Sequence, residues 1–143
     1  MRITRSLISA ALALLAGVAL SLTTAPAAQA GCSSAVSGSY NWDGTISTHV
    51  RGTSCSTRSA HLTVSGNENC CTPFWVKIER QLWGSYGWLT TNTQVKSTLW
   101  SGYIELNTAT VPSRPSDGSE RFHACWGVGS SQPGSWDCGP WVS

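Results

Sequence analysis

Polar and apolar residues alternate in short runs along the second part of the chain, which is typical of half-buried β-strands. The clearest run extends from Phe74 to Trp83, and it is followed by a four-residue hairpin loop, Gly84–Gly87, and a second run from Trp88 to Val95. In the first run one face carries Phe74, Val76, Ile78 and Leu82, and the other carries Lys77, Glu79 and Gln81. Arg80 is the exception, because it is a charged residue at an apolar position.

The same alternation predicts further strands and no helix. They cover Ser39–Val50 with a turn at Asp43–Gly44, His61–Ser65, Thr98–Leu106 and Glu120–Val128. A long loop is expected from Thr108 to Ser119, where Pro112, Pro115 and Gly118 lie. About seven short strands separated by turns predict an all-β fold, an antiparallel β-sandwich that is immunoglobulin-like or a small barrel.

The first 30 residues have the composition of a secretory signal peptide. Two arginines, Arg2 and Arg5, precede an apolar run over residues 7–22, and Ala28-Gln29-Ala30 forms a small-residue cleavage box. The apolar run is short for a retained membrane span, which needs about 20 residues. We therefore expect a signal peptide at residues 1–30 and one secreted, extracellular domain at residues 31–143.

The charge of this domain bears on its partners. The chain has nine Lys and Arg and seven Asp and Glu, and loss of the two leader arginines leaves seven of each, a formal charge of zero. Nucleic acids and anionic membranes are held by clustered basic charge, so the sequence predicts neither as a partner. A neutral domain is also unsuited to cationic attack on membranes. We expect a monomer without a membrane span.

Six cysteines follow the predicted cleavage point, and an even number in a short exported domain predicts a disulfide framework. They are Cys32, Cys55, Cys70, Cys71, Cys125 and Cys138. The turn at residues 130–135 places Cys125 and Cys138 on facing strands, which predicts one bridge. Cys70 and Cys71 point to opposite sides in an extended chain, so different partners are expected, with Cys32 and Cys55 as the candidates.

Lipidation of Cys32 is the alternative to a disulfide there. It would leave one of the other five thiols without an intramolecular partner, and Gln29 occupies the position where a lipoprotein box has a Leu-like residue. The disulfide is favoured.

No motif for catalysis or for metal binding is present. His123 and Cys125 lie two residues apart, as a base and a nucleophile would, but a cysteine of an exported framework is expected to be oxidised. His49 and His61 lie on other strands, and all three histidines are expected to be isolated and partly exposed. The carboxylates are scattered over Asp43, Glu68, Glu79, Glu105, Asp117, Glu120 and Asp137. We predict a protein that is not an enzyme, with no cofactor and no metal.

Tryptophan is the unusual feature, with eight residues in the domain. Trp100 and Trp126 share faces with apolar residues and are predicted to be core. Trp83 falls on a polar face, across the hairpin loop from Trp88, and Tyr86 lies in that loop. These three residues are the candidate aromatic platform for stacking on a sugar or anchoring a protein. The alternatives are that other elements cover this face, or that the two indoles form a stabilising cross-strand pair.

A structural role is predicted for Trp136 and Trp141, which are expected to fix the C-terminal strand to the body of the domain. Trp75 shares the polar face of its strand with Trp83.

Two segments, Arg80-Gln81-Leu82-Trp83 with Gly87-Trp88-Leu89-Thr90, and Arg121 to Gly127, resemble small exported actinobacterial proteins without assigned activity. The resemblance implies an all-β extracellular domain and no catalytic residues. The predicted function is a secreted, non-enzymatic binding module for polysaccharide or cell-wall glycan. The alternatives are a disulfide-braced inhibitor of a secreted protease or glycosidase, acting through the loop Arg51–Arg58, and a hydrolase, which requires two carboxylates in one cleft about 5 to 10 Å apart.

Overall fold

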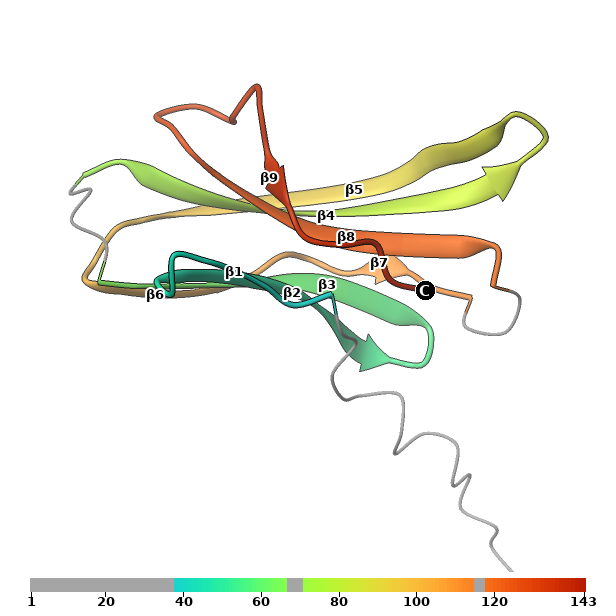
Figure 1. Cartoon of the computed structure of the whole chain (residues 1–143), viewed down its shortest axis with the longest axis horizontal. Coiled ribbons are helices and arrows are strands. Elements are labelled where there is room, and N and C mark those ends of the chain that lie inside the picture. The colour runs from blue at the N-terminus through green and yellow to red at the C-terminus, as the bar shows by residue number, and fades with distance from the viewer. Residues whose placement is uncertain (1–37, 67–70, 115–117) are drawn as a thin grey trace, which may run out of the picture.

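The structure is a computed structural model that describes residues 38–66, 71–114 and 118–143 of the chain (Figure 1). The predicted signal peptide, Cys32 and Cys70 lie outside these residues. Within them the chain forms nine strands and no helix, and no helix there is long and apolar enough to cross a membrane. The strands are β1 (Tyr40–Trp42), β2 (Ile46–Ser54), β3 (Thr57–Ser65), β4 (Pro73–Gly84), β5 (Gly87–Leu99), β6 (Tyr103–Asn107), β7 (Val111–Pro112), β8 (Glu120–Val128) and β9 (Asp137–Cys138).

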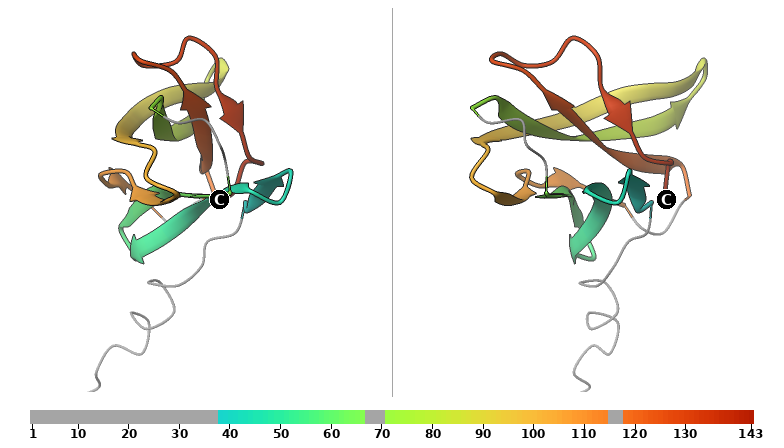
Figure 2. Two further views of the ribbon diagram at one scale, coloured as in Figure 1. Left: turned by 90° about the vertical axis from the view of Figure 1, so that its left-hand side faces the viewer. Right: turned by 60° about the vertical axis from the view of Figure 1, so that its left-hand side comes forward.

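Two antiparallel sheets pack face to face, so the predicted β-sandwich is confirmed (Figure 2). Sheet A has the order β1-β2-β3-β6, and β7 also pairs with β3. Sheet B has the order β5-β4-β8-β9. The predicted run Thr98–Leu106 is two strands, because Gly102 at φ 92° turns the chain from β5 in sheet B to β6 in sheet A.

The core lies between the sheets and uses the alternation of the sequence. From sheet B it receives Phe74, Val76, Ile78, Phe122 and Ala124, and from sheet A it receives Ile46, Val50, Ala60, Leu62, Val64, Ile104, Leu106 and Val111. Trp100 and Trp126 are partly buried against this core, as predicted. Each fully buried aliphatic or Phe side chain contributes about 1.5 to 3 kcal/mol, which holds the two sheets together.

Arg80 faces the interior with only 5% of its surface exposed, because a buried acid balances its charge. Its Nη2 and Nε donate to Glu120 Oε2 at 2.8 and 3.0 Å, and its Nη1 donates to Asn92 Oδ1 at 3.1 Å. The other carboxylate oxygen, Oε1, accepts from the Ser113 hydroxyl at 2.7 Å and from the Arg114 backbone N–H. Arg80 thus occupies an apolar position of the strand pattern because it forms a buried ion pair with Glu120.

The β4–β5 hairpin is tighter than predicted. Gly84 pairs with Gly87, so the loop contains only Ser85 and Tyr86 instead of four residues. Gly87 has φ 104°, a conformation that costs a glycine little, and this lets the pairing continue to the loop. The hairpin extends beyond the rest of sheet B (Figure 1), which brings its tip into solvent.

The predicted disulfide between Cys125 and Cys138 is confirmed. These residues are register partners on β8 and β9, with an S–S distance of 2.02 Å. Cys55 and Cys71 are also disulfide-bonded, and no cysteine among the described residues is free. The Cys125–Cys138 bridge fixes the two-residue edge strand β9 to β8.

Candidate binding surface

The three residues of the predicted platform lie at and beside the tip of the β4–β5 hairpin. Trp83 is 60% exposed, Tyr86 is 95% exposed and Trp88 is half-buried. Trp83 and Trp88 are register partners whose ring centroids lie 5.3 Å apart at an interplanar angle of 69°. The two indoles thus form an edge-to-face cross-strand pair, so the tip is an angular aromatic surface and not a flat one.

Trp88 begins a stack of rings on the outer face of sheet B. The Arg121 guanidinium lies 4.3 Å from the centroid of Trp88 and 4.3 Å from that of Trp141, so it is held between two indoles. Trp141 in turn stacks on His123, with centroids 3.6 Å apart and planes within 14°. Arg121 comes from β8 and Trp88 from β5, whereas Trp141 follows β9, so the stack ties three separate segments together.

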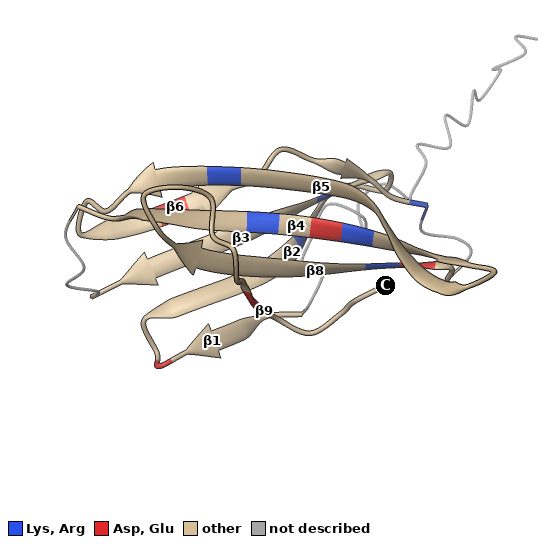
Figure 3. Cartoon of the chain, turned by 90° about the horizontal axis from the view of Figure 1, so that it is seen from above, with Lys and Arg blue, Asp and Glu red and all other residues tan. Residues whose placement is uncertain are grey.

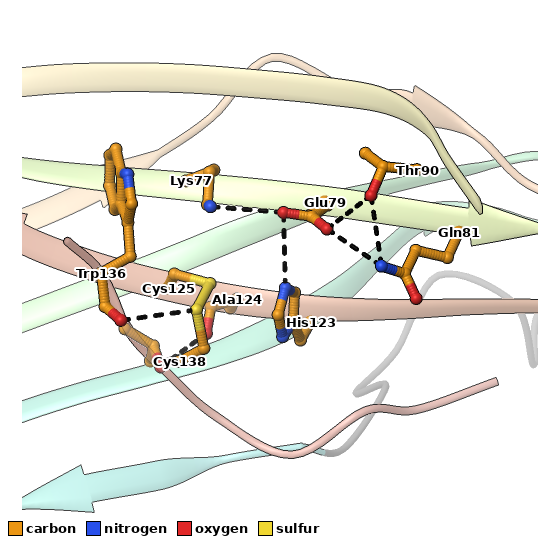
Figure 4. Close-up of a disulfide and its surroundings, with 10 residues drawn as sticks. Lys77, Glu79, Gln81, Thr90, His123, Ala124, Cys125, Trp136 and Cys138 are labelled. Carbon is orange, nitrogen blue, oxygen red and sulfur yellow. Dashed lines mark hydrogen bonds and ion pairs between the residues drawn. A yellow bond between two sulfur atoms is a disulfide. The ribbon is translucent and has the colours of Figure 1, made fainter. Parts of the chain in front are cut away.

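A row of polar side chains runs along β4 beside this stack (Figure 4). Glu79 Oε1 accepts from Thr90 Oγ1 at 2.8 Å and from Gln81 Nε2 at 3.2 Å. Gln81 Oε1 accepts from Nε and Nη2 of Arg121 at 2.9 and 2.7 Å, which connects the polar row to the ring stack. Lys77 Nζ lies 3.3 Å from Glu79 Oε2. These contacts fix each side chain in one orientation.

The row ends at another indole. Lys77 Nζ lies 4.9 Å from the ring centroid of Trp136, which the β8–β9 loop holds over the sheet. Trp75 is half-buried and donates its Nε1–H to the Gly129 carbonyl at 2.8 Å, so it anchors the start of that loop. Hence the outer face of sheet B carries polar groups from Lys77 to Gln81, with aromatic rings at both ends. We call this set of residues the aromatic–polar face.

The protonation states on this face follow from burial and from neighbouring charges. Burial is the main cause that lowers the pKa of His123, and the opposing attraction of Glu79, whose Oε2 lies 3.7 Å from His123 Nε2, does not reverse the shift. Burial alone would raise the pKa of Glu79, but hydrogen bonds from Thr90 and Lys77 and the Lys77 charge bring it below its ordinary value. At neutral pH Glu79 is therefore ionised and His123 is neutral.

Charges of both signs occur close together on this sheet. Figure 3 shows basic and acidic positions alternating along β4, where Lys77, Glu79 and Arg80 lie. Arg80 points inward to Glu120, so the outer face has Lys77 and Arg121 against Glu79. The aromatic–polar face is thus weakly positive and mostly polar, which suits a neutral or weakly acidic ligand more than a polyanion.

The chemistry of His123 and Cys125 is limited by the disulfide. Both side chains lie on the same face of β8, but Cys125 is bonded to Cys138 and is no nucleophile. Among the described residues, the one group of three metal-ligand side chains is His123, Cys125 and Cys138, and the two sulfur atoms are joined to each other.

Five carboxylates lie within the described residues: Asp43, in the turn after β1, and Asp137, on β9, are exposed, and the other three face different layers. Glu79 lies on the outer face of sheet B, Glu120 lies between the sheets, and Glu105 is exposed on sheet A. Glu79 was expected to face solvent but is largely covered, with 17% of its side chain accessible. Glu68 and Asp117 lie outside the described residues.

The histidines differ from the expectation of isolated, partly exposed residues. His61 and His123 are buried, and His49 and His61 are register partners whose ring centroids lie 4.7 Å apart. His61 uses Nδ1 to bond Asn107 Oδ1 at 2.8 Å, and Nε2 to contact Thr63 Oγ1 at 3.1 Å. The prediction treated strands as separate units, whereas register brings the two rings together.

Several residues of the face were not identified from the sequence. Arg121 and His123 lie two residues apart on β8 and thus share the face of Cys125. The spacing of two residues was therefore sufficient to predict that Arg121 and His123 lie on this face. Trp141 follows the last strand, so no alternation could place it; its contact with Arg121 depends on the bridge between Phe122 and Val142. No protein-family model, curated protein or solved structure matches the chain, and the resemblance to exported actinobacterial proteins stays a prediction.

Proposed function

We propose that this protein is a secreted, non-enzymatic binding module that holds a polysaccharide on the aromatic–polar face of sheet B. The observation that carries the proposal is the exposed ring of Trp83 next to a row of polar groups that is already ordered by the Arg121 stack. The oxidised Cys125–Cys138 pair supports an extracellular location, since disulfides persist in oxidising compartments.

A sugar ring presents an apolar C–H face and a rim of hydroxyl groups, and this face of the protein offers both complements. Trp83 and Tyr86 supply apolar rings, which are preferred where one side of a contact is apolar and the other is wet. Gln81, Thr90 and Glu79 supply amide, hydroxyl and carboxylate groups for hydrogen bonds. Lys77 and Glu79 have only 14% and 17% of their side chains accessible, so a ligand would reach mainly the part of this row next to Trp83.

Side chains that are fixed before a ligand arrives lower the entropic cost of binding on this face. Immobilising a flexible side chain on binding costs about 0.5 to 1.5 kcal/mol, so side chains that are already fixed bind at a lower cost. Here Gln81 is fixed by Arg121, and Arg121 is fixed between Trp88 and Trp141. The free protein thus needs little rearrangement of this row to accept a ligand.

The inhibitor alternative receives less support from the β2–β3 hairpin. Ser54 pairs with Thr57, so the expected loop Arg51–Arg58 is a tight turn at Cys55 and Ser56. Arg58 is buried, and its Nη1 donates to the carbonyls of Ser54 and Thr57 at 2.8 and 3.0 Å. An inhibitory loop must enter a target's cleft, and this turn offers a short, internally bonded tip.

Co-sedimentation with insoluble chitin, cellulose and purified cell wall tests the proposal. We expect one polymer to deplete the oxidised protein from the supernatant, and the double substitution Trp83→Ala and Tyr86→Ala to abolish that depletion. Tyr103→Ala is the matched control, because Tyr103 is an aromatic residue that is 55% exposed on sheet A. Equal depletion of the double variant and the parent would contradict the proposed site, and no depletion by any polymer would exclude these glycans.

A further inference from the structure

A second surface, on sheet A, contains a polar cavity of about 350 Å³. It is lined by Arg51, Gly52, Thr53, Ser59, Asn107, Thr108 and Thr110, from β2, β3, the end of β6 and the segment between β6 and β7. Its volume is within the range of small-molecule sites, which begins at about 300 Å³. Except for Gly52, all lining residues have polar side chains, and Arg51 is the one charged residue among them.

The cavity exists because the chain leaves β3 between two strands. β6 pairs with β3 up to Asn107 and β7 pairs again from Val111, so residues 108–110 interrupt the ladder. Thr108 closes the interruption: its N–H donates to the Ala60 carbonyl at 3.0 Å, and its hydroxyl accepts the Ala60 N–H at 3.0 Å. The backbone N–H and carbonyl of Ala60 are thereby paired where the ladder is interrupted, and Thr108 is fixed in the lining of the cavity.

Arg51 is oriented at one wall of this cavity. Its Nη1 lies 3.4 Å from Asn107 Oδ1 and 3.4 Å from His61 Nδ1. The same Asn107 oxygen makes the shorter contact of 2.8 Å with His61 Nδ1, so the amide is held by a buried imidazole. A guanidinium has five N–H donors in a planar fork that matches a carboxylate. The two long contacts therefore orient Arg51 without exhausting its donors.

We propose that this cavity binds a small hydroxylated carboxylate, of the chemical class of a uronic acid, with the carboxylate on Arg51 and the hydroxyls on Asn107, Thr53 and Thr110. No acidic residue lines the cavity. Glu105 contacts His61 Nε2 at 3.7 Å, whereas Asn107 contacts the other ring nitrogen, Nδ1. This site is independent of the aromatic–polar face, and the two outer faces of a sandwich point in opposite directions (Figure 2).

Titration of the isotopically labelled, oxidised chain with sodium glucuronate, followed by amide NMR shifts, tests the inference. Glucose and sodium phosphate at matched ionic strength are the comparison probes. We expect saturable shifts at Gly52, Thr53, Asn107 and Thr110 with glucuronate, and much weaker binding of either comparison probe. Arg51→Gln should weaken glucuronate binding about tenfold or more, since a charge-assisted hydrogen bond is lost. Arg114→Gln, at an exposed arginine elsewhere, should leave it unchanged.

Thr110→Val removes one hydroxyl at nearly constant volume and should weaken glucuronate binding a few-fold in a protein with an otherwise unchanged spectrum. Shifts that do not saturate, shifts confined to other surfaces, or unchanged binding by Arg51→Gln would overturn the site. Phosphate binding as tight as glucuronate would overturn the assignment to a hydroxylated ligand. Because none of the three probes is a polymer, and because the shifts are read at residues of sheet A, failure here is distinguishable from failure of the polysaccharide proposal.

Discussion

Replacement of Arg121 by Ala is expected to destabilise the domain by about 2.5 to 3.5 kcal/mol. Two cation–π contacts of about 0.5 to 1 kcal/mol each are lost, with Trp88 and Trp141. The charged hydrogen bonds to Gln81 Oε1 contribute about another 1.5 kcal/mol. Urea unfolding measures the change as a shift of the midpoint at constant slope.

Two further variants separate geometry from charge in this prediction. Arg121→Lys keeps the charge but lacks the planar fork, so it should recover less than half of the loss. Lys96→Ala, at an exposed basic position on β5, is the control and should stay within about 0.5 kcal/mol of the parent. A loss below about 0.5 kcal/mol for Arg121→Ala would refute the conclusion that this residue ties the three segments together.

Three other predictions concern the disulfide, the buried ion pair and the response to pH. Changing both Cys125 and Cys138 to Ala should cost about 3 kcal/mol, the stabilisation expected from a bridge that closes a loop of about 15 residues, and thermal unfolding under matched conditions would detect it. Glu120→Gln should lower the free energy of unfolding by about 3 to 5 kcal/mol, because it leaves Arg80 buried without its counter-ion. The double variant Arg80→Met with Glu120→Gln should lose less stability than Glu120→Gln alone. The opposite order would contradict a buried pair. The pKa of His123 is lower in the folded protein than in the unfolded chain, so the unfolded chain binds the proton more readily. The contribution of His123 to stability is therefore full above about pH 6.5, the ordinary pKa of histidine, and is lost as the pH falls below it. His123→Gln should flatten the fall of the melting temperature between about pH 7 and 5.

The strand pattern was predictable because burial in a sandwich follows strand parity. Phe74, Val76 and Ile78 are buried at alternate positions, as their spacing predicted. The meaning of Arg80 was not predictable, because its partner Glu120 lies 40 positions away and faces it only after β4 and β8 pair. Parity along one strand identifies the face of a side chain, but it does not identify the partner across the sheet.

For the candidate site, too, the sequence predicted which side chains are exposed but not which side chains contact each other. Exposure of Trp83 and Tyr86 followed from their place on a polar face and in a turn, and both are exposed. The plane of Trp88 was not predictable, because Arg121 and Trp141 fix it from distant parts of the chain. Angles between side chains depend on sheet register and on the course of the C-terminal segment, which a single sequence does not specify.

The most direct test of the aromatic–polar face is the indole N–H signal of Trp83 during titration with soluble oligosaccharides from chitin, cellulose and peptidoglycan, each tested separately. We expect one of the three to shift this signal saturably, together with the amides of Gln81 and Thr90, while the amide of Tyr103 on sheet A stays unchanged. Larger shifts on sheet A than at Trp83, or a Trp83 signal that none of the three moves, would contradict the account.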